Sequence, residues 1–386
     1  MKKIFIIGTA YPYRGGLAAY NERLATEFMN NGEKVTIHTF KLQYPGFLFP
    51  GKSQFASWDV PKHLSIKRTV NSINPFNWIW LGRKIKRIKP DLVIFKYWIP
   101  FMAPCFGTIA RIIKQNKKTR IITIVDNMIP HEKRPGDKLL NRYFVKPIDA
   151  YIAMSDSVLE DIKNIDPEKP RTFSPHPLFD NFGDEVSKKD ALNKLGLPDH
   201  HKYILFFGFI REYKGLDLLL KAIAEKEVKD LPVRVLVAGE FYTKPDPYYD
   251  LIKQLKIEDR VILKTDFIAN REVKNYFCAS DIVVQPYKSA TQSGVTQIAY
   301  HFNKPMIVTD VGGLAEIVPD GKVGYVVQKN PAAIARAIHA FFTENRSRGF
   351  IENIKNEKKK YSWSRMVEAI ETIYKSINNQ QNNKKC

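Results

Sequence analysis

The chain has 386 residues, of which 44% are hydrophobic and 12% aromatic, and its formal net charge is +21. This composition supports packed cores in two or three domains and excludes disorder, collagen and coiled coil as the main architecture. Residues 1–180 hold 29 basic and 15 acidic residues, so most of the excess charge lies in the first half. Such a field favours anionic partners, meaning nucleic acid, phospholipid head groups or phosphorylated small molecules, without choosing among them.

Cysteine usage and hydropathy indicate the setting of the protein. Cys105, Cys278 and Cys386 are far apart and odd in number, so we expect neither a disulfide framework nor a cysteine zinc site. The apolar run before Gly8 is too short for a signal peptide, and no stretch of about 18 apolar residues follows. We therefore expect a reducing, cytoplasmic setting and no membrane-spanning helix.

In the first half, short β-branched and aromatic runs alternate with amphipathic stretches. Strands are predicted over residues 3–9, 34–40, 92–98, 120–125, 150–155 and 172–175. Apolar residues at three- and four-residue spacing predict a helix over residues 16–31. Alternation of this kind predicts a parallel sheet covered by helices.

Residues 78–90 form a basic amphipathic pattern. Trp78, Leu81, Ile85 and Ile88 share one helical face, and five Lys and Arg residues lie elsewhere. The favoured interpretation is that the apolar face packs on the sheet and leaves the cations solvated. A contact with anionic lipid is the second interpretation, and it is compatible with the first because solvated cations can still face a bilayer.

The strand–helix rhythm restarts after a polar segment, and we place a domain boundary near residues 178–190. The second series of strands is predicted over residues 203–208, 233–238, 260–263, 281–285, 306–309 and 324–327. The sequence thus predicts an α/β protein with two doubly wound domains facing each other across a cleft, over 1–180 and 185–345. Helices are expected over 331–343 and 361–377, and the polar residues 379–386 are expected to be a flexible tail.

Three loops at predicted strand ends suit an anion. Gly15 and Gly16 precede the first helix, where close backbone approach and helix-end amides favour a phosphate, although paired glycines also suit a simple turn. Arg211 and Lys214 follow a buried strand, where two cations can hold a diphosphate; solvated loop charges are the alternative.

The third loop precedes a helix that is expected to begin near Gly294. The amides of Ser293, Gly294 and Val295 can there face a phosphate. A further loop with Gly312, Gly313 and Glu316 follows the next strand. Together they indicate an anion site beside a sugar-sized space.

The whole chain, over residues 1–378, resembles a family 4 (group 1) glycosyltransferase of GT-B fold. The resemblance rests on the strings RGGLAAYNERLATEFMNNGEKVTI, IREYKGLDLLLKAI, IAYHFNKPMIVTDVGGLAEIVPDGKVGYVV and YSWSRMVEAIETIY, in this order. It implies an acceptor-binding first domain completed by the last helix, about residues 361–378, and a nucleotide-sugar-binding second domain. It also implies retaining sugar transfer without a metal or other cofactor, and no Asp-x-Asp motif is present.

Residue by residue, the resemblance places Arg211 and Lys214 on the donor diphosphate, and Gly15 and Gly16 on a loop that faces donor phosphate and acceptor. Glu316 matches a family glutamate and, with His131, is predicted to be catalytic. The family's Glu-x7-Glu pair would fall on Ala290 and Ile298, so this carboxylate pair is missing. Sugar or ribose contacts are therefore assigned to Gln292, Gln297, Gly312 and Gly313, since glutamine can still form hydrogen bonds.

A histidine completes the predicted site. His131 follows the strand 120–125, where related enzymes have a histidine that contacts the transferred sugar, and a purely structural histidine is the alternative. Asp126 and Glu132 are weaker candidates. His176 lies near the domain boundary, where a hinge or packing role is favoured over catalysis.

The sequence therefore predicts a hexosyltransferase that moves a sugar from a nucleotide-diphosphate sugar to a glycan or polyprenyl-linked acceptor, in polysaccharide or cell-surface glycan biosynthesis. A catalytically reduced scaffold protein that binds sugar nucleotides is the alternative, since it would explain the missing glutamates. Nucleic-acid binding would explain only the charge. Peripheral attachment to an anionic membrane, at the inner face of the plasma membrane, is a further expectation.

Overall fold

The computed structural model describes residues 1–46, 54–55, 61–129, 135–290 and 293–383. The chain divides into two compact units, each with its own parallel sheet. The first unit comprises Met1–Pro177 together with the segment that begins at Tyr361, and the second comprises Leu178–Lys360.

The first unit is built on a seven-stranded sheet in the order β3-β2-β1-β4-β5-β6-β7, in which every neighbouring pair is parallel. Its strands are β1 (Lys3–Ile7), β2 (Lys34–Leu42), β3 (Ile66–Asn71), β4 (Leu92–Tyr97), β5 (Arg120–Val125), β6 (Ala150–Ala153) and β7 (Arg171–Phe173). All residues of β4 and β5 are buried, because helices cover both faces of a parallel sheet.

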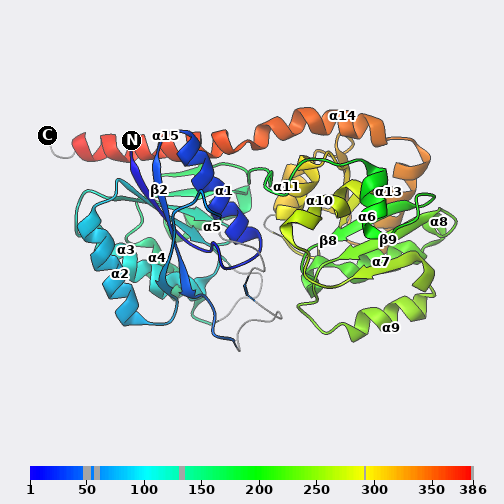
Figure 1. Ribbon diagram of the computed structural model, residues 1–386, viewed down its shortest axis with the longest axis horizontal. Helices are drawn as coiled ribbons and strands as arrows, with labels where there is room; N and C mark the ends of the chain where they lie inside the picture. The colour runs from blue at the N-terminus through cyan, green and yellow to red at the C-terminus, as the bar shows by residue number, and fades with distance from the viewer. Residues whose placement is uncertain (47–53, 56–60, 130–134, 291–292, 384–386) are drawn as a thin grey trace. The chain divides into compact units, whose positions relative to one another are not determined.

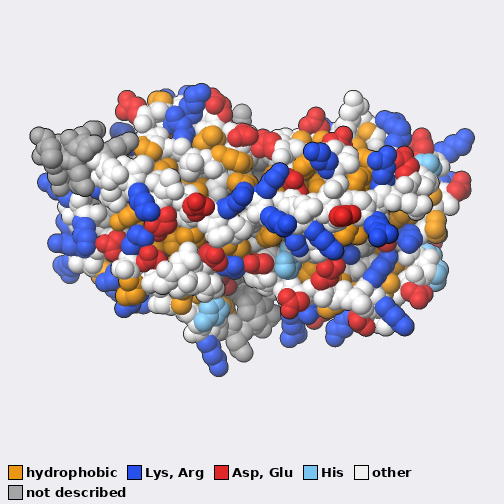
Figure 2. All heavy atoms as spheres, turned by 90° about the horizontal axis from the view of Figure 1, so that it is seen from above, with side chains coloured by type: hydrophobic (Ala, Val, Ile, Leu, Met, Phe, Trp, Pro, Cys, Tyr) orange, Lys and Arg blue, Asp and Glu red, His pale blue; other side chains and the backbone are white. Residues whose placement is uncertain are grey.

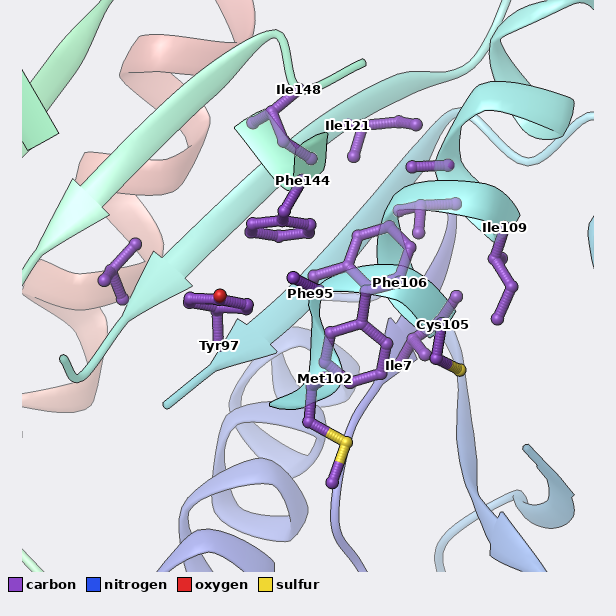
Figure 3. Close-up of a cluster of buried hydrophobic side chains, with 14 of the residues drawn as sticks. Ile7, Phe95, Tyr97, Met102, Cys105, Phe106, Ile109, Ile121, Phe144 and Ile148 are labelled. Atoms are coloured by element: carbon purple, nitrogen blue, oxygen red, sulfur yellow. The ribbon is translucent and has the colours of Figure 1, made fainter. Parts of the chain in front are cut away.

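The described residues of this unit form six α-helices (Figure 1). They are α1 (Gly16–Asn30), α2 (Pro75–Ile88), α3 (Ala103–Lys114), α4 (Asp137–Val145), α5 (Asp156–Ile165) and α15 (Trp363–Asn383). The core between β4, α3 and α4 is aromatic, and Figure 3 shows the rings of Tyr97, Phe106 and Phe144 in it. The rings of Tyr97 and Phe144 are stacked with their centroids 4.2 Å apart, an arrangement that stabilises beyond the buried area alone.

The second unit has a six-stranded parallel sheet in the order β10-β9-β8-β11-β12-β13. Its strands are β8 (Lys202–Phe207), β9 (Val233–Ala238), β10 (Val261–Lys264), β11 (Ile282–Gln285), β12 (Met306–Thr309) and β13 (Gly324–Val327). Its α-helices are α6 (Lys188–Leu195), α7 (Leu216–Ala224), α8 (Lys226–Lys229), α9 (Asp246–Leu255), α10 (Asn270–Ala279), α11 (Gly294–His301), α12 (Gly313–Ile317), α13 (Pro331–Thr343) and α14 (Ser347–Glu357).

The predicted fold class, two doubly wound parallel sheets, is confirmed, and all twelve predicted strands are present. Strand β3 was not predicted. It is an edge strand whose Lys67 and Arg68 are exposed, so it lacks the apolar run that marked the others. Helix α15 continues to Asn383, beyond the expected end at Ile377, since neither Pro nor Gly interrupts the polar residues that follow.

Among the described residues, no helix combines the length and the apolar character that crossing a membrane requires. Cationic and acidic side chains are interspersed on the face shown in Figure 2.

Candidate functional site

In the second unit, the strand order reverses between β8 and β11, which are neighbours in the sheet although β9 and β10 separate them in the chain. Ligands of doubly wound sheets bind outside the carboxyl ends of the strands at such a point. The loops that follow β8 and β11 carry Arg211, Lys214, Ser293 and Gly294. Four predicted site residues therefore lie in the two loops that flank this switch point.

Two glycines shape the loop after β8. Gly215 has a φ of +67°, and a Cβ on it would lie 2.0 Å from the carbonyl oxygen of Pro286, in the loop after β11. Gly208 has a φ of +95°, and its Cβ would lie 2.9 Å from Lys214 Nζ. Only glycine allows both the left-handed backbone and these approaches. The two loops are thereby held in direct contact.

Lys214 is buried in this loop, with 8% of its surface exposed. It ends a 3₁₀ turn, Glu212–Lys214, and its amide donates to the carbonyl of Arg211 at 3.0 Å. Its Nζ lies 5.5 Å from the ring centroid of Tyr287, and no ion pair to a carboxylate is present in the described part of the chain. Burial and, second, the neighbouring Arg211 lower the pKa of Lys214 to about 8. The site thus holds an ammonium whose charge no carboxylate of the described residues balances.

Arg211 lies at the amino end of the same turn and is partly exposed. Its Cζ is 5.2 Å from the ring centroid of Tyr242, which itself stacks on Phe209 at 4.2 Å. A guanidinium held over an aromatic face keeps its charge and its planar donors available. Arg211 and Lys214 together form a cationic pair at the strand end.

The amino end of α11 lies beside this pair. Ser293 is the N-cap residue, and its Oγ accepts a hydrogen bond from the Val295 amide at 3.2 Å. The Val295 amide is therefore used by the cap, which differs from the expectation that it is open to a ligand. Ser293 Oγ also lies 3.3 Å from the Tyr287 hydroxyl, which ties the start of the helix to the loop. The amide of Gly294 remains the candidate anion donor.

Helix α11 carries Gln297 and Ile298, and Ala290 lies in the loop before it. Ala290 and Ile298 are both buried. Gln297 is fully buried, and neither polar atom of its side chain has a hydrogen-bond partner among the described residues. Such a group calls for a polar partner, which agrees with the predicted role of Gln297 without testing it. Gln292 lies outside the described residues.

The loop after β12 contains the remaining second-unit candidates. Gly312 has a φ of +46° and precedes the short helix α12, which starts at Gly313. Glu316 is exposed on that helix. The sugar or ribose contacts of Gly312 and Gly313 and the catalytic role of Glu316 stay predictions.

In the first unit, Gly15 and Gly16 start helix α1 after β1. Gly15 has a φ of +103°, and a Cβ added to it would meet no atom within 4 Å. Among the described residues no side chain caps this helix end, and the amides of Ala18 and Ala19 donate to the carbonyl of Gly15 at 3.1 and 3.2 Å. Glu22, which the sequence did not single out, accepts a hydrogen bond from the Tyr11 amide at 2.7 Å, and burial raises the pKa of Glu22 to about 7.

Asp126 follows β5, and it forms an ion pair at 2.8 Å with Lys96 of β4. Lys96 has 1% of its surface exposed, and its Nζ lies 3.4 Å from the ring centroid of Tyr20. The same ring contacts His176 and Trp363, each at 5.1 Å between centroids. A lysine inside an otherwise apolar strand was the sequence signal for this cluster, and it was missed.

His176 is buried, and its Nδ1 lies 2.7 Å from the carbonyl oxygen of Pro177. Burial and then Lys96 lower the pKa of His176 to about 3, so the ring is neutral at pH 7. This environment agrees with a packing role beside the unit boundary. His131 and Glu132 lie outside the described residues.

No group of three or more His, Cys, Asp or Glu side chains is arranged as a metal site within the described ranges. Cys105 and Cys278 are buried free thiols. Metal independence remains a prediction from the sequence.

Two models of known protein families match the chain. Residues 14–175 match the model described as Glycosyltransferase Family 4, and residues 201–344 match the model described as Glycosyl transferases group 1. The chain belongs to this glycosyltransferase family. The predicted family is thus confirmed, and each of the two matched segments lies within one structural unit.

A relative of this family 4 chain is D-inositol 3-phosphate glycosyltransferase of Corynebacterium urealyticum, 26% identical over 263 residues, which are 64% of this chain and 61% of the relative. The chain spans about half to three fifths of the length of the first curated relatives it matches, at 61%, 49% and 47%.

Solved structures confirm the GT-B fold. A glycosyltransferase from Rickettsia africae is 17% identical, with a TM-score of 0.73 over 97% of this chain and 98% of that one. HepE of Anabaena in complex with UDP-glucose is 14% identical, with a TM-score of 0.68 over 99% and 100%.

Proposed function

We propose that the protein is a retaining, metal-independent glycosyltransferase that takes its sugar from a nucleotide-diphosphate donor bound in the second unit. The observation that carries the proposal is the buried ammonium of Lys214, which has no carboxylate partner in the described chain. A buried charge is stable only with a counter-charge. A donor diphosphate would supply it, and the UDP-glucose complex of HepE makes a nucleotide sugar the matching ligand class.

In this mechanism the second unit stabilises the leaving group. Breakage of the bond between the anomeric carbon and the phosphate oxygen leaves negative charge on the nucleoside diphosphate. Lys214 and Arg211 would hold that charge, and the Gly294 amide at the start of α11 would add a fixed dipole. Prearranged cations and amides of this kind supply much of the rate acceleration in group transfer.

The acceptor would bind in the first unit, near the uncapped start of α1 at Gly15 and Gly16. Its hydroxyl gives up a proton as it attacks the anomeric carbon, and the departing phosphate oxygen can take that proton. Glu316, exposed on α12, is the second-unit carboxylate proposed to be catalytic. The acceptor class is a glycan or a polyprenyl-linked glycan, and the attachment of the protein to an anionic membrane is part of the same proposal.

The second candidate function is a sugar-nucleotide-binding scaffold with reduced catalysis. The specific observation in its favour is that Ala290 and Ile298 are apolar and buried at the two positions of the family's carboxylate pair. A scaffold would retain the cationic pair and bind a nucleotide without turnover.

The test is a panel of nucleotide sugars, measured for binding by thermal shift and for turnover by release of nucleoside diphosphate with glycan and lipid-linked acceptors. Acceptor-dependent release that is lost in an Arg211→Ala/Lys214→Met variant supports the enzyme. Binding without release for every acceptor favours the scaffold. The absence of nucleotide binding would contradict both the enzyme and the scaffold proposals.

A further inference from the structure

Helix α2 is fixed to the first unit by one face only. Leu81 and Ile85 are fully buried in the core. A Cβ on Gly82 would lie 2.9 Å from Cβ of Ile112, so α2 is closely packed against α3 at this point. Trp78 is partly buried, and its Nε1 donates to the carbonyl of Asn71 at 2.6 Å. The opposite face of the helix is therefore held rigidly toward solvent.

That outward face is apolar at its amino end. Phe76 has 83% of its surface exposed, Trp80 has 49%, and Ile73, just before the helix, has 49%. Ile79 is also exposed. Large apolar side chains gathered on a solvent-facing surface mark an interaction site more often than single ones do.

Cations follow the apolar residues along the same helix. Arg83, Lys84, Arg87 and Lys89 are all exposed, and none forms an ion pair with a carboxylate in the described part of the chain. Residues 72–90 contain neither Asp nor Glu. Lys84 Nζ lies 4.8 Å from the ring centroid of Trp80. Charge of one sign thus borders the apolar residues.

The helical repeat brings these residues onto one stripe. Phe76, Trp80, Arg83 and Arg87 recur at spacings of four, three and four, which keeps them on one side of a helix with 3.6 residues per turn. The stripe is about 16 Å long at 1.5 Å per residue. We name the exposed residues Ile73, Phe76, Ile79, Trp80, Arg83, Lys84, Arg87 and Lys89 the α2 patch.

We propose that the α2 patch docks on an anionic lipid bilayer. Tryptophan and phenylalanine suit the head-group boundary, and each Lys or Arg near an anionic surface strengthens binding about fivefold. The unbalanced positive charge is complementary to such a surface. A single-stranded nucleic acid would use the cations and rings but gives no role to Ile73 and Ile79, because aliphatic side chains offer no stacking face. The bilayer accounts for all three kinds of side chain.

The inference rests in part on the proposed function, because a lipid-linked acceptor would require the enzyme at a membrane. Vesicle binding and nucleotide binding are separate measurements. A protein that does not bind vesicles could therefore still bind UDP at the donor site. A protein that does not bind UDP could still bind vesicles.

The experiment is flotation of the full-length protein with neutral phosphatidylcholine vesicles and with vesicles that contain one third phosphatidylglycerol. The test variant is Trp80→Ser/Lys84→Gln. The matched control is Tyr249→Ser/Lys253→Gln on α9 of the second unit, which removes an exposed aromatic residue and a cation at the same spacing and changes the net charge equally. Urea unfolding of both variants, monitored by tryptophan fluorescence and by circular dichroism, checks that each is folded.

The wild type is expected to float with anionic vesicles only, the test variant to bind them roughly tenfold more weakly, and the control to bind as the wild type does. Flotation that is indifferent to lipid charge, or absent, would overturn the proposal. Equal loss in both variants would overturn the assignment to α2. Binding of single-stranded RNA that the test variant loses, while vesicle binding stays unchanged, would assign the patch to nucleic acid instead.

Discussion

Two lysines near the carboxyl ends of parallel strands, Lys96 in the first unit and Lys214 in the second, are both buried but differ in what balances their charge. Lys96 pairs with Asp126 at 2.8 Å and lies against the ring of Tyr20. Lys214 Nζ lies 5.5 Å from the ring centroid of Tyr287, and among the described residues the charged group that shifts its pKa is the cation Arg211. The two units thus each bury a lysine near a strand end, with a carboxylate partner in the first unit and with none among the described residues of the second.

The difference separates a structural charge from a binding charge. Burial of an ion costs several kcal/mol, which a partner carboxylate offsets for Lys96 within the protein itself. Lys214 has no such compensation in the described chain, so its burial destabilises the ligand-free protein. Groups of this kind concentrate at functional sites. The comparison predicts opposite behaviour when each lysine is removed.

The largest expected effect is on stability. Lys96→Met would remove the buried cation that pairs with Asp126 at 2.8 Å, and the free energy of unfolding of the first unit should fall by more than about 1 kcal/mol, the upper range for an exposed pair. Urea unfolding monitored by tryptophan fluorescence measures it. The control is Lys114→Met, which breaks a more exposed pair with Asp149 and should cost about 1 kcal/mol or less. An equal fall in the free energy of unfolding in the two variants would mean that the buried pair stabilises the unit no more than the exposed pair does.

The next effect is on donor affinity. Lys214→Met should weaken UDP binding roughly 10- to 150-fold, the loss of one charge-assisted hydrogen bond, without lowering the melting temperature. Calorimetric titration and thermal unfolding measure the two quantities. Lys288→Met is the control, since Lys288 lies in the same region but is already paired with Asp217 at 2.9 Å. A Lys214 variant that melts earlier and binds UDP normally would make this lysine structural.

A smaller effect is expected at Arg211, which is partly exposed. Arg211→Lys keeps the charge but removes the planar pair of donors, so UDP affinity should fall by about tenfold or less. The same calorimetric titration tests it. A loss larger than that of Lys214→Met would reverse the order of the two cations.

The smallest effect is at Tyr20. Its hydroxyl is buried and has no hydrogen-bond partner among the described residues, so Tyr20→Phe should leave the first unit at least as stable as the wild type. Tyr287→Phe, which removes the contact with Ser293 Oγ at 3.3 Å, should instead cost about 0.5–1.5 kcal/mol. Urea unfolding compares the two, and a clear loss at Tyr20 would mean that its hydroxyl is bonded.

The strand pattern predicted the sheets because buried parallel strands read as continuous apolar runs. It missed the edge strand β3, because Lys67 and Arg68 are exposed and interrupt the apolar run that marks a buried strand. The same reasoning found Lys214 from its place after a strand, but not that it is buried and without a carboxylate partner, which depends on contacts between separate loops. Lys96 was missed because its partner, Asp126, comes from a neighbouring strand.

In α2, the pattern identified the buried face but not the second apolar group opposite it. Ile88, expected on the buried face, is 37% exposed at the helix end. Phe76 and Trp80 lie outside the apolar face that the sequence pattern predicts. Whether these two side chains are buried or exposed depends on which elements pack beside the helix, and the sequence does not show this. The use of the Val295 amide by the Ser293 cap was likewise a matter of local geometry that the sequence left open.

Proton uptake on UDP binding shows whether the Lys214 ammonium binds the donor diphosphate. The pKa of Lys214 in the free protein is about 8, and a bound diphosphate would raise it. Binding should then take up nearly one proton at pH 9 and about a tenth of one at pH 7, and affinity should fall roughly tenfold per pH unit above 8. Calorimetry in buffers of different ionisation enthalpy measures the uptake. Lys214→Met is expected to abolish the proton uptake. Uptake that is absent in the wild type, or that persists in the variant, would mean that Lys214 does not bind the diphosphate.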